Sequence, residues 1–174
     1  QGVSSAASDV YKRQDQFLIY YQPRVQTQTG KLLGIEALIR WQHPTRGLVL
    51  PNDFIGLAEE TDLIHPIGEL VVDKVCAQLA SWLKQGVEAV PVSVNVSPHQ
   101  FNEGKVKKSL AASLAKHGIP ASLLEIELTE SAMMRNIGDI FDELTAINEM
   151  GIKVHVDDFG TGYSSLSLLQ RLDM

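Results

Sequence analysis

The chain has 174 residues, of which 44% are hydrophobic, and its formal net charge is −6. This length is enough for one well-packed domain, and no apolar run in the sequence is long enough to span a bilayer. The acidic balance argues against general nucleic-acid binding, because phosphate backbones are held by clusters of Lys and Arg. The single cysteine, Cys76, lies in an apolar helical pattern, so we expect a buried thiol and a cytoplasmic setting. A membrane anchor of the parent protein would have to lie outside the printed sequence.

The first fourteen residues do not share the periodic pattern of the rest. Within them, residues 9–14 resemble the translation of a transposase-end sequence that is used in preparing sequencing libraries. We therefore interpret residues 1–14 as an adapter artefact and expect the protein domain to occupy residues 15–174. The last residues, 168–174, follow a helical pattern without a closing cap, which we interpret as an incomplete reading frame.

Two β-strands are predicted first along the chain, at residues 17–21 and 33–40, where β-branched and aromatic residues gather. One unit then recurs three times: an amphipathic helix, a Gly at its C-terminal end and a short β-like run. The helices are predicted at residues 69–85, around 106–114 and around 140–147, followed by Gly86, Gly118 and Gly151. The strands after them are predicted at residues 90–95, 123–127 and 152–157.

Repeats of this length predict an α/β fold in which parallel strands are joined by helices. Either an open doubly wound sheet or a (β/α) barrel has this pattern. A complete (β/α)8 barrel needs roughly 250 residues. The five predicted strands therefore amount to an incomplete TIM-like barrel, whose remaining strands we expect downstream.

Polar residues end several of the predicted strands, at Glu36, Asn95, Glu127 and the pair Asp157 and Asp158. The C-terminal strand ends of a barrel meet at one rim, which is where that fold places its active site. These side chains offer only oxygen ligands, which suit Mg²⁺ or Mn²⁺ better than a softer metal. The alternative is that each acid caps a helix or lies at the surface. His155 shares a strand face with Asp157, and we interpret it as a core histidine.

Several segments together resemble one known family. Glu36 to Trp41 is similar to the EAL signature of cyclic di-GMP phosphodiesterases. Other segments match that family in order and approximate spacing, and together they cover most of the chain from Phe17 onward: residues 21–23, 54–60, 94–97, 127–131 and 157–165.

The resemblance implies a modified (β/α) barrel that hydrolyses cyclic di-GMP to linear pGpG with two divalent metals, Mg²⁺ or Mn²⁺. It implies that Glu36, Asp157 and Asp158 are catalytic, and that Gln22 and Arg40 bind the substrate, with Arg40 facing a phosphate. The implied ligands of the first metal are Glu36, Asn95, Glu127 and Asp157, while Asp157 bridges to a second metal that Asp158 also binds. The implied loop that couples dimer contacts to the metals comprises Phe159, Gly160, Thr161 and Gly162, held by Glu130.

The resemblance also sets expectations beyond the printed sequence. The catalytic Lys of the family and a further metal-binding Glu would follow Met174, so we expect the chain by itself to be inactive. We expect a homodimer in the full domain and an upstream GGDEF (diguanylate cyclase) or sensory domain. A second hypothesis stays open: the parent protein is a non-catalytic receptor for cyclic di-GMP, or a protein-interaction module.

Overall fold

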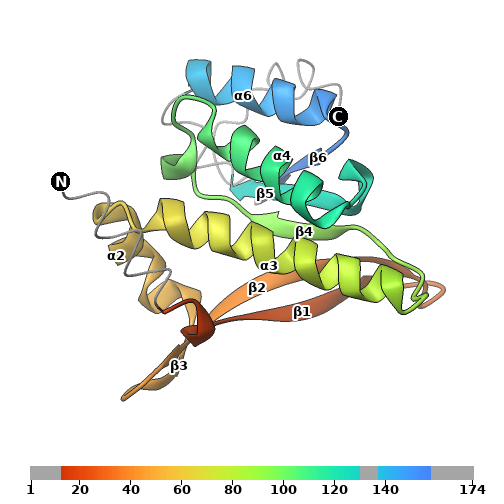
Figure 1. The fold of residues 1–174 in the computed structure, drawn as a ribbon, viewed down its shortest axis with the longest axis horizontal. Helices are drawn as coiled ribbons and strands as arrows, with labels where there is room; N and C mark the ends of the chain where they lie inside the picture. The colour runs from red at the N-terminus through yellow and green to blue at the C-terminus, as the bar shows by residue number, and fades with distance from the viewer. Residues whose placement is uncertain (1–12, 130–136, 158–174) are drawn as a thin grey trace.

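The computed structural model describes residues 13–129 and 137–157 as one mixed sheet with helices packed on it (Figure 1). Its strands are β1 (Phe17–Val25), β2 (Leu32–His43), β3 (Gly47–Val49), β4 (Val92–Asn95), β5 (Leu124–Thr129) and β6 (Lys153–Asp157). Its α-helices are α2 (Ile55–Glu60), α3 (Ile64–Lys84), α4 (Lys105–His117) and α6 (Ile137–Glu149). Short 3₁₀ turns complete it: η1 (Gln14–Gln16), η2 (Pro51–Asp53), η3 (Pro98–Gln100) and η4 (Ala121–Leu123).

The strand order in the sheet is β1-β2-β4-β5-β6, with β3 paired to β2. Strands β2, β4, β5 and β6 are parallel, as the recurring helix–strand unit predicts, whereas β1 runs antiparallel to β2. All five predicted strands form, and β3 was not predicted. Strand β1 continues through Pro23 to Val25, because within the described sheet it pairs only with β2 and a proline is tolerated on such an edge strand.

The sheet has one apolar face and one polar face, because successive side chains of a strand point to opposite sides. Helices α3, α4 and α6 cover the apolar face (Figure 1). The core between them is formed by fully buried residues of both layers: Val92, Val94, Leu124, Ile126, Val75, Leu79, Leu110, Leu144 and Ile147. The intervening residues of the same strands are polar and lie on the uncovered face, so this alternation supplies the side chains of the candidate site.

A second, smaller core lies where β1 begins and β2 ends. It contains Phe17, Val49, Phe54, Ala58, Ile64 and Ile67. The Trp41 ring stacks on that of Phe17 in this second core, with centroids 5.8 Å apart, whereas the Trp82 ring packs edge-on against Tyr21 at 5.2 Å beside the main core. Both tryptophans therefore pack against a neighbouring aromatic ring. This core holds α2 against the end of the sheet, beside the carboxyl ends of the parallel strands.

Helix α3 begins at Ile64, five residues before the predicted start at residue 69. Its first turn contains Pro66, which fits there because the first N–H groups of a helix have no partner inside the helix. The helix passes so close to η3 that a Cβ at Gly68 would overlap the side-chain amide of Gln100. Cys76 on this helix is fully buried, as predicted. No helix in the described residues has the length and hydrophobicity that crossing a bilayer requires.

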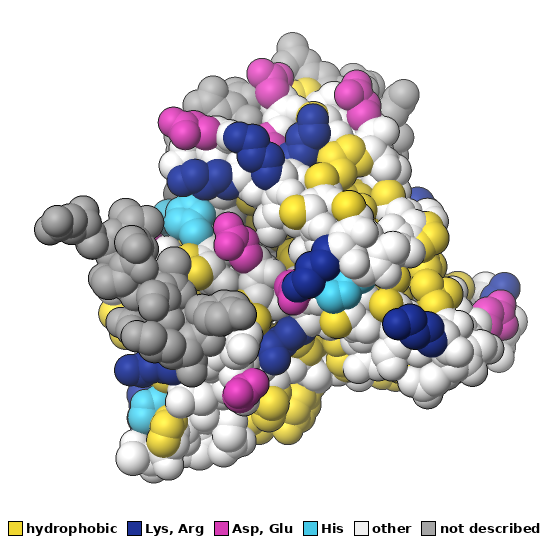
Figure 2. All heavy atoms as spheres, in the orientation of Figure 1, with side chains coloured by type: hydrophobic (Ala, Val, Ile, Leu, Met, Phe, Trp, Pro, Cys, Tyr) yellow, Lys and Arg dark blue, Asp and Glu magenta, His cyan; other side chains and the backbone are white. Residues whose placement is uncertain are grey.

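The helix-covered side of the molecule carries charges of both signs. Figure 2 shows Lys and Arg side chains interspersed with Asp and Glu over this face. One contact between them joins two helices, because Asp73 of α3 accepts hydrogen bonds from Lys116 at 2.7 Å and His117 at 2.8 Å, both on α4. These contacts tie the helix layer together on the side of the sheet opposite the candidate site.

Candidate functional site

The polar face of the sheet gathers side chains from neighbouring strands in matching register. Glu36 of β2 pairs with Ser93 of β4, and Asn95 of β4 pairs with Glu127 of β5, which in turn pairs with His155 of β6. Gln22 of β1 lies opposite Glu36. The structure therefore brings four of the predicted site residues to one face, near the carboxyl ends of the parallel strands.

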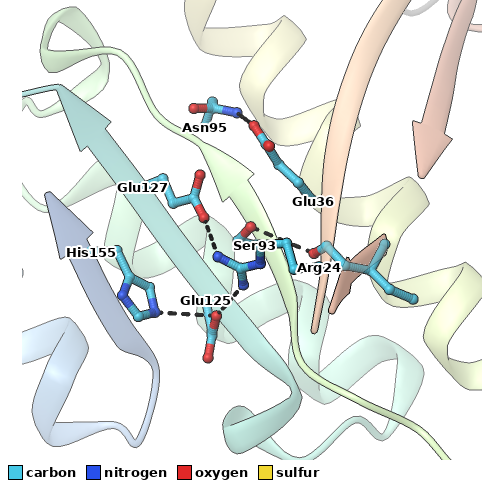
Figure 3. A network of polar contacts seen from close by, with 8 residues as sticks. Arg24, Glu36, Ser93, Asn95, Glu125, Glu127 and His155 are labelled. Carbon is cyan, nitrogen blue, oxygen red and sulfur yellow. Dashed lines mark hydrogen bonds and ion pairs between the residues drawn. The ribbon is translucent and has the colours of Figure 1, made fainter. Parts of the chain in front are cut away.

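Glu36 and Asn95 are in direct contact. The Asn95 side-chain amide donates a hydrogen bond of 2.9 Å from Nδ2 to Glu36 Oε1 (Figure 3). The contact joins residues 59 positions apart in sequence, and parallel pairing of β2 with β4 makes it possible. The second carboxylate oxygen of Glu36 and the amide oxygen of Asn95 make no hydrogen bond to another described side chain.

A second polar cluster on this face was not predicted. The Arg24 guanidinium donates from Nη1 to Glu127 Oε1 at 2.7 Å and from Nη2 to Glu125 Oε2 at 2.8 Å (Figure 3). The two carboxylates are nearly buried, with side chains 10% and 8% exposed. The period-two spacing of Glu125 and Glu127 could have indicated that they share a face, but no local pattern pointed to Arg24 as their partner.

His155 is not the core residue that we predicted. Its side chain is 44% exposed and lies on the polar face, 3.1 Å from Nε2 to Glu125 Oε2. The geometry of this contact is not that of a hydrogen bond, and Nε2 is buried with no hydrogen-bond partner in the described part of the chain. The physical reason is the strand alternation, which sends Val154 under the helices and His155 to the opposite face.

The donor atoms of this face suit a hard divalent cation. Glu36, Asn95 and Glu127 come from three adjacent strands and offer only oxygen ligands. Among residues 13–129 and 137–157, no three Asp, Glu, His or Cys side chains converge into a complete metal-binding cluster. The described residues therefore supply part of a metal site. Its ligands are the carboxylates of Glu36 and Glu127 and the amide of Asn95, which lies on the strand between them.

Other predicted site residues are placed by the backbone or lie outside the description. Asp157 ends β6 opposite Thr129. Arg40 projects from β2 on the face of Glu36, where its guanidinium contacts the Ile39 carbonyl at 2.8 Å and lies 5.3 Å from the centre of the Tyr20 ring. Six predicted residues lie outside the described residues: Asp158, Glu130, Phe159, Gly160, Thr161 and Gly162.

A cavity of about 460 Å³ opens beside these side chains. Asn95 and Glu127 line one side of it, and its apolar wall comes from Leu38, Ile55, Ile64 and Ile67. Polar groups at its edge include Asn52, Glu59 and Ser97. The Ser97 hydroxyl donates to Glu59 Oε1 at 2.6 Å, which holds the carboxylate of α2 next to the loop that follows β4. Its volume and mixed lining are typical of a small-molecule site.

Burial shifts the pKa of two groups beneath the sheet. Desolvation, with a smaller contribution from the nearby Asp73 charge, raises the pKa of the Cys76 thiol to about 11. Desolvation, together with Cys76, raises the pKa of the Tyr21 hydroxyl to about 12. Both groups are therefore neutral near pH 7, and neither lies on the polar face.

The chain is similar to known proteins over most of its length. A family model described as EAL domain matches residues 5–174. The chain is 42% identical over 157 residues to the bifunctional diguanylate cyclase/cyclic di-GMP phosphodiesterase MucR of Pseudomonas aeruginosa. It is 41% identical over 157 residues to the cyclic di-GMP phosphodiesterase PdeR of Escherichia coli. Each alignment covers 90% of this chain and 23% of the relative, so the chain spans less than a quarter of these curated proteins.

A solved structure gives the same match in three dimensions. The structure of PaMucR phosphodiesterase in complex with c-di-GMP superposes with a TM-score of 0.86 at 39% identity. The superposition covers 96% of this chain and 68% of that one. The α/β, TIM-like fold expected from the repeating units is therefore confirmed over most of the chain.

Proposed function

The chain belongs to the EAL domain family, and we propose on that premise that its parent domain hydrolyses cyclic di-GMP to linear pGpG. One observation supports the proposal most. Glu36, Asn95 and Glu127, from three adjacent strands, meet on one polar face beside a cavity of about 460 Å³. Convergence of oxygen ligands next to a ligand-sized cavity is the arrangement that a metal-dependent phosphodiesterase needs.

The proposed cofactors are two divalent cations, Mg²⁺ or Mn²⁺. Glu36, Asn95, Glu127 and Asp157 would hold one cation, and Asp157 and Asp158 would hold the other. Bound there, the pair would supply an activated water and stabilise the charge on the leaving oxygen. Without cations, the carboxylates of this face repel an anionic phosphodiester, so substrate binding should itself depend on metal.

The protein's own residues bind and orient the substrate in this proposal. Arg40 provides a permanent positive charge on the face of Glu36, so it can pair with a phosphate of cyclic di-GMP. Gln22, opposite Glu36 on β1, can hydrogen-bond to the same nucleotide. The apolar wall of the cavity can take a base, and Glu59 and Asn52 at its edge can hydrogen-bond to the polar rim of that base.

Assembly and regulation are part of the same proposal. Glu130 and the segment from Phe159 to Gly162 would couple a homodimer contact to the cations, as the family resemblance implies. An upstream GGDEF or sensory domain would control the activity. The chain spans less than a quarter of its curated relatives, so the homodimer contact and the upstream domain are proposed for the whole protein.

The test is hydrolysis by the full-length protein. Purified protein is incubated with cyclic di-GMP in Mg²⁺, in Mn²⁺ and in EDTA, and pGpG is followed by chromatography. We expect hydrolysis only with a divalent cation, and a loss of at least about 100-fold in Glu36→Gln, which removes one ligand charge but preserves size. Glu88→Gln, in the exposed segment between α3 and β4, is the matched control and should keep full activity. Binding of cyclic di-GMP without hydrolysis in any metal would instead support the non-catalytic receptor.

A further inference from the structure

We propose that Arg24 is a positioning residue that holds the carboxylate of Glu127 in the orientation in which it binds a cation. The inference rests on the proposed function, because it assigns a role toward the cation site. Arg24 is not one of the predicted site residues, and Glu127 is the predicted site residue that it contacts. Four observations support the inference.

The reach of Arg24 is the first observation. Arg24 lies on β1, whereas its partners lie on β5, and β2 and β4 separate these strands in the sheet. Its guanidinium crosses this distance and contacts Glu127 at 2.7 Å and Glu125 at 2.8 Å with two different nitrogens. The guanidinium is therefore fixed by two contacts, because each of two nitrogens donates to a different, nearly buried carboxylate.

The space available to the Arg24 side chain is the second observation. Gly34 of β2 lies directly opposite Arg24 in the antiparallel register. A Cβ at Gly34 would lie 3.0 Å from Arg24 Nη2 and 3.2 Å from the Pro91 carbonyl oxygen. The absence of a side chain at this position therefore leaves room for the guanidinium beside β2.

Electrostatics explains why an arginine suits this place. Glu125 and Glu127 are two residues apart on one face of β5, so their like charges repel each other in a poorly solvated environment. A guanidinium is always charged, and its planar fork can satisfy both carboxylates at once, which an ammonium cannot do with the same geometry. Arg24 thus compensates the pair and restricts the rotation of both side chains.

The consequence concerns the second oxygen of Glu127. Arg24 engages Oε1, and Figure 3 shows the other oxygen turned away from the guanidinium, on the side where Asn95 and Glu36 lie. Glu127 is therefore oriented before any cation binds, with one oxygen held by Arg24 and the other directed to the site. Contacts of this kind behind a metal ligand typically change metal affinity by about 10–100-fold when they are removed.

The test is the affinity of the full-length protein for Mn²⁺ alone, measured by isothermal titration calorimetry without nucleotide. Arg24→Met keeps much of the side-chain volume and removes the fork, so we expect Mn²⁺ to bind about 10–100-fold more weakly. Arg24→Lys restores a charge without the fork and should be intermediate. Arg46→Met, in the exposed turn between β2 and β3, is the matched control and should bind Mn²⁺ like the wild type.

Hydrolysis kinetics give a second readout that a purely structural role would not move. The Arg24 variants should need more Mn²⁺ for half-maximal activity and should recover most of kcat at saturating Mn²⁺. Circular dichroism checks that each variant is folded, and Arg24→Lys decides the question if Arg24→Met does not fold.

Three results would overturn the inference. Unchanged affinity in a folded Arg24 variant would mean that the contact has no role in metal binding, and tighter binding would mean that Arg24 competes with the cation for Glu127. If the wild-type protein binds no Mn²⁺ at all, the proposed function fails and this inference fails with it. If the wild type binds Mn²⁺ and the variants do not differ from it, only the inference fails.

Discussion

Gly68→Ala should destabilise the protein, although alanine is a better helix former than glycine. Gly68 lies in α3, where the substitution by itself contributes about 0.8–1 kcal/mol of stability. The added Cβ would overlap the Gln100 side-chain amide, with Gln100 Cδ only 2.9 Å away, so this side chain must turn aside. Its Oε1 accepts the Ser97 backbone N–H at 2.9 Å, in the capping box of η3.

The expected change in the free energy of unfolding is the difference between the gain in helix propensity and the cost of the lost hydrogen bond. A partly buried N–H that loses its acceptor costs about 1–3 kcal/mol, which exceeds the gain in helix propensity. We therefore expect a net loss on the order of 1 kcal/mol in the free energy of unfolding. Loss of the hydrogen bond between Gln100 and Ser97 should loosen the loop after Asn95. Ser97 in this loop holds Glu59 at the cavity edge, so cyclic di-GMP affinity should fall as well.

Urea unfolding followed by circular dichroism measures this difference. Gly56→Ala in α2 is the matched control, because a Cβ there meets nothing within 4 Å, and it should be neutral or stabilising by up to about 1 kcal/mol. A double-mutant cycle with Gln100→Ala tests the cause, since Gly68→Ala should become stabilising once the Gln100 side chain is gone. The reasoning is refuted if Gly68→Ala matches Gly56→Ala in the wild-type background, or if removing Gln100 leaves its effect unchanged.

Two further predictions concern the helix layer. The Cys76 thiol is fully buried and burial raises its pKa to about 11, so the folded protein should not react with a thiol reagent at pH 8; stoichiometric labelling without unfolding would contradict this. Partial burial would raise the pKa of the Asp73 carboxyl, but hydrogen bonds from Lys116 and His117 outweigh it and leave the pKa below its usual value. A lowered carboxyl pKa stabilises the fold above the unfolded-state pKa of about 3.9 and loses this effect as pH falls through the folded-state value. Asp73→Asn should therefore lower the free energy of unfolding at pH 7, by less than about 1 kcal/mol because the side chain is 36% exposed, and should have a smaller effect at pH 2; an equal effect at both pH values would rule out the ion-pair explanation.

Much of the site was predictable because it depends on strand ends. Asn95 and Glu127 each follow a short apolar run after a helix that ends at glycine, and parallel strands of such repeats place their carboxyl ends together. Glu36 was predictable from the motif around it. The Glu36 and Asn95 contact is therefore a consequence of a pattern that is visible in the chain.

The errors and omissions have physical reasons of their own. His155 was predicted on the strand face of Asp157, and the register places it there. Its interpretation as a core residue was wrong, because no described helix covers that face and its side chain is 44% exposed. Strand β3 was missed because three residues are too short to show a period. The early start of α3 was missed because a proline in the first turn resembles a boundary.

The sequence by itself determined the α/β class, the order of helices and strands, and the oxygen-rich set of residues at the strand ends. These features depend on local periodicity and on motifs within a few residues, and a linear chain displays both. Only the tertiary structure decided that Arg24 contacts Glu127, 103 positions away, that β1 runs antiparallel to β2, and that α2 lines a cavity beside Asn95. Such contacts depend on the register of strands and on packing between layers, and neither has a local signature in the sequence.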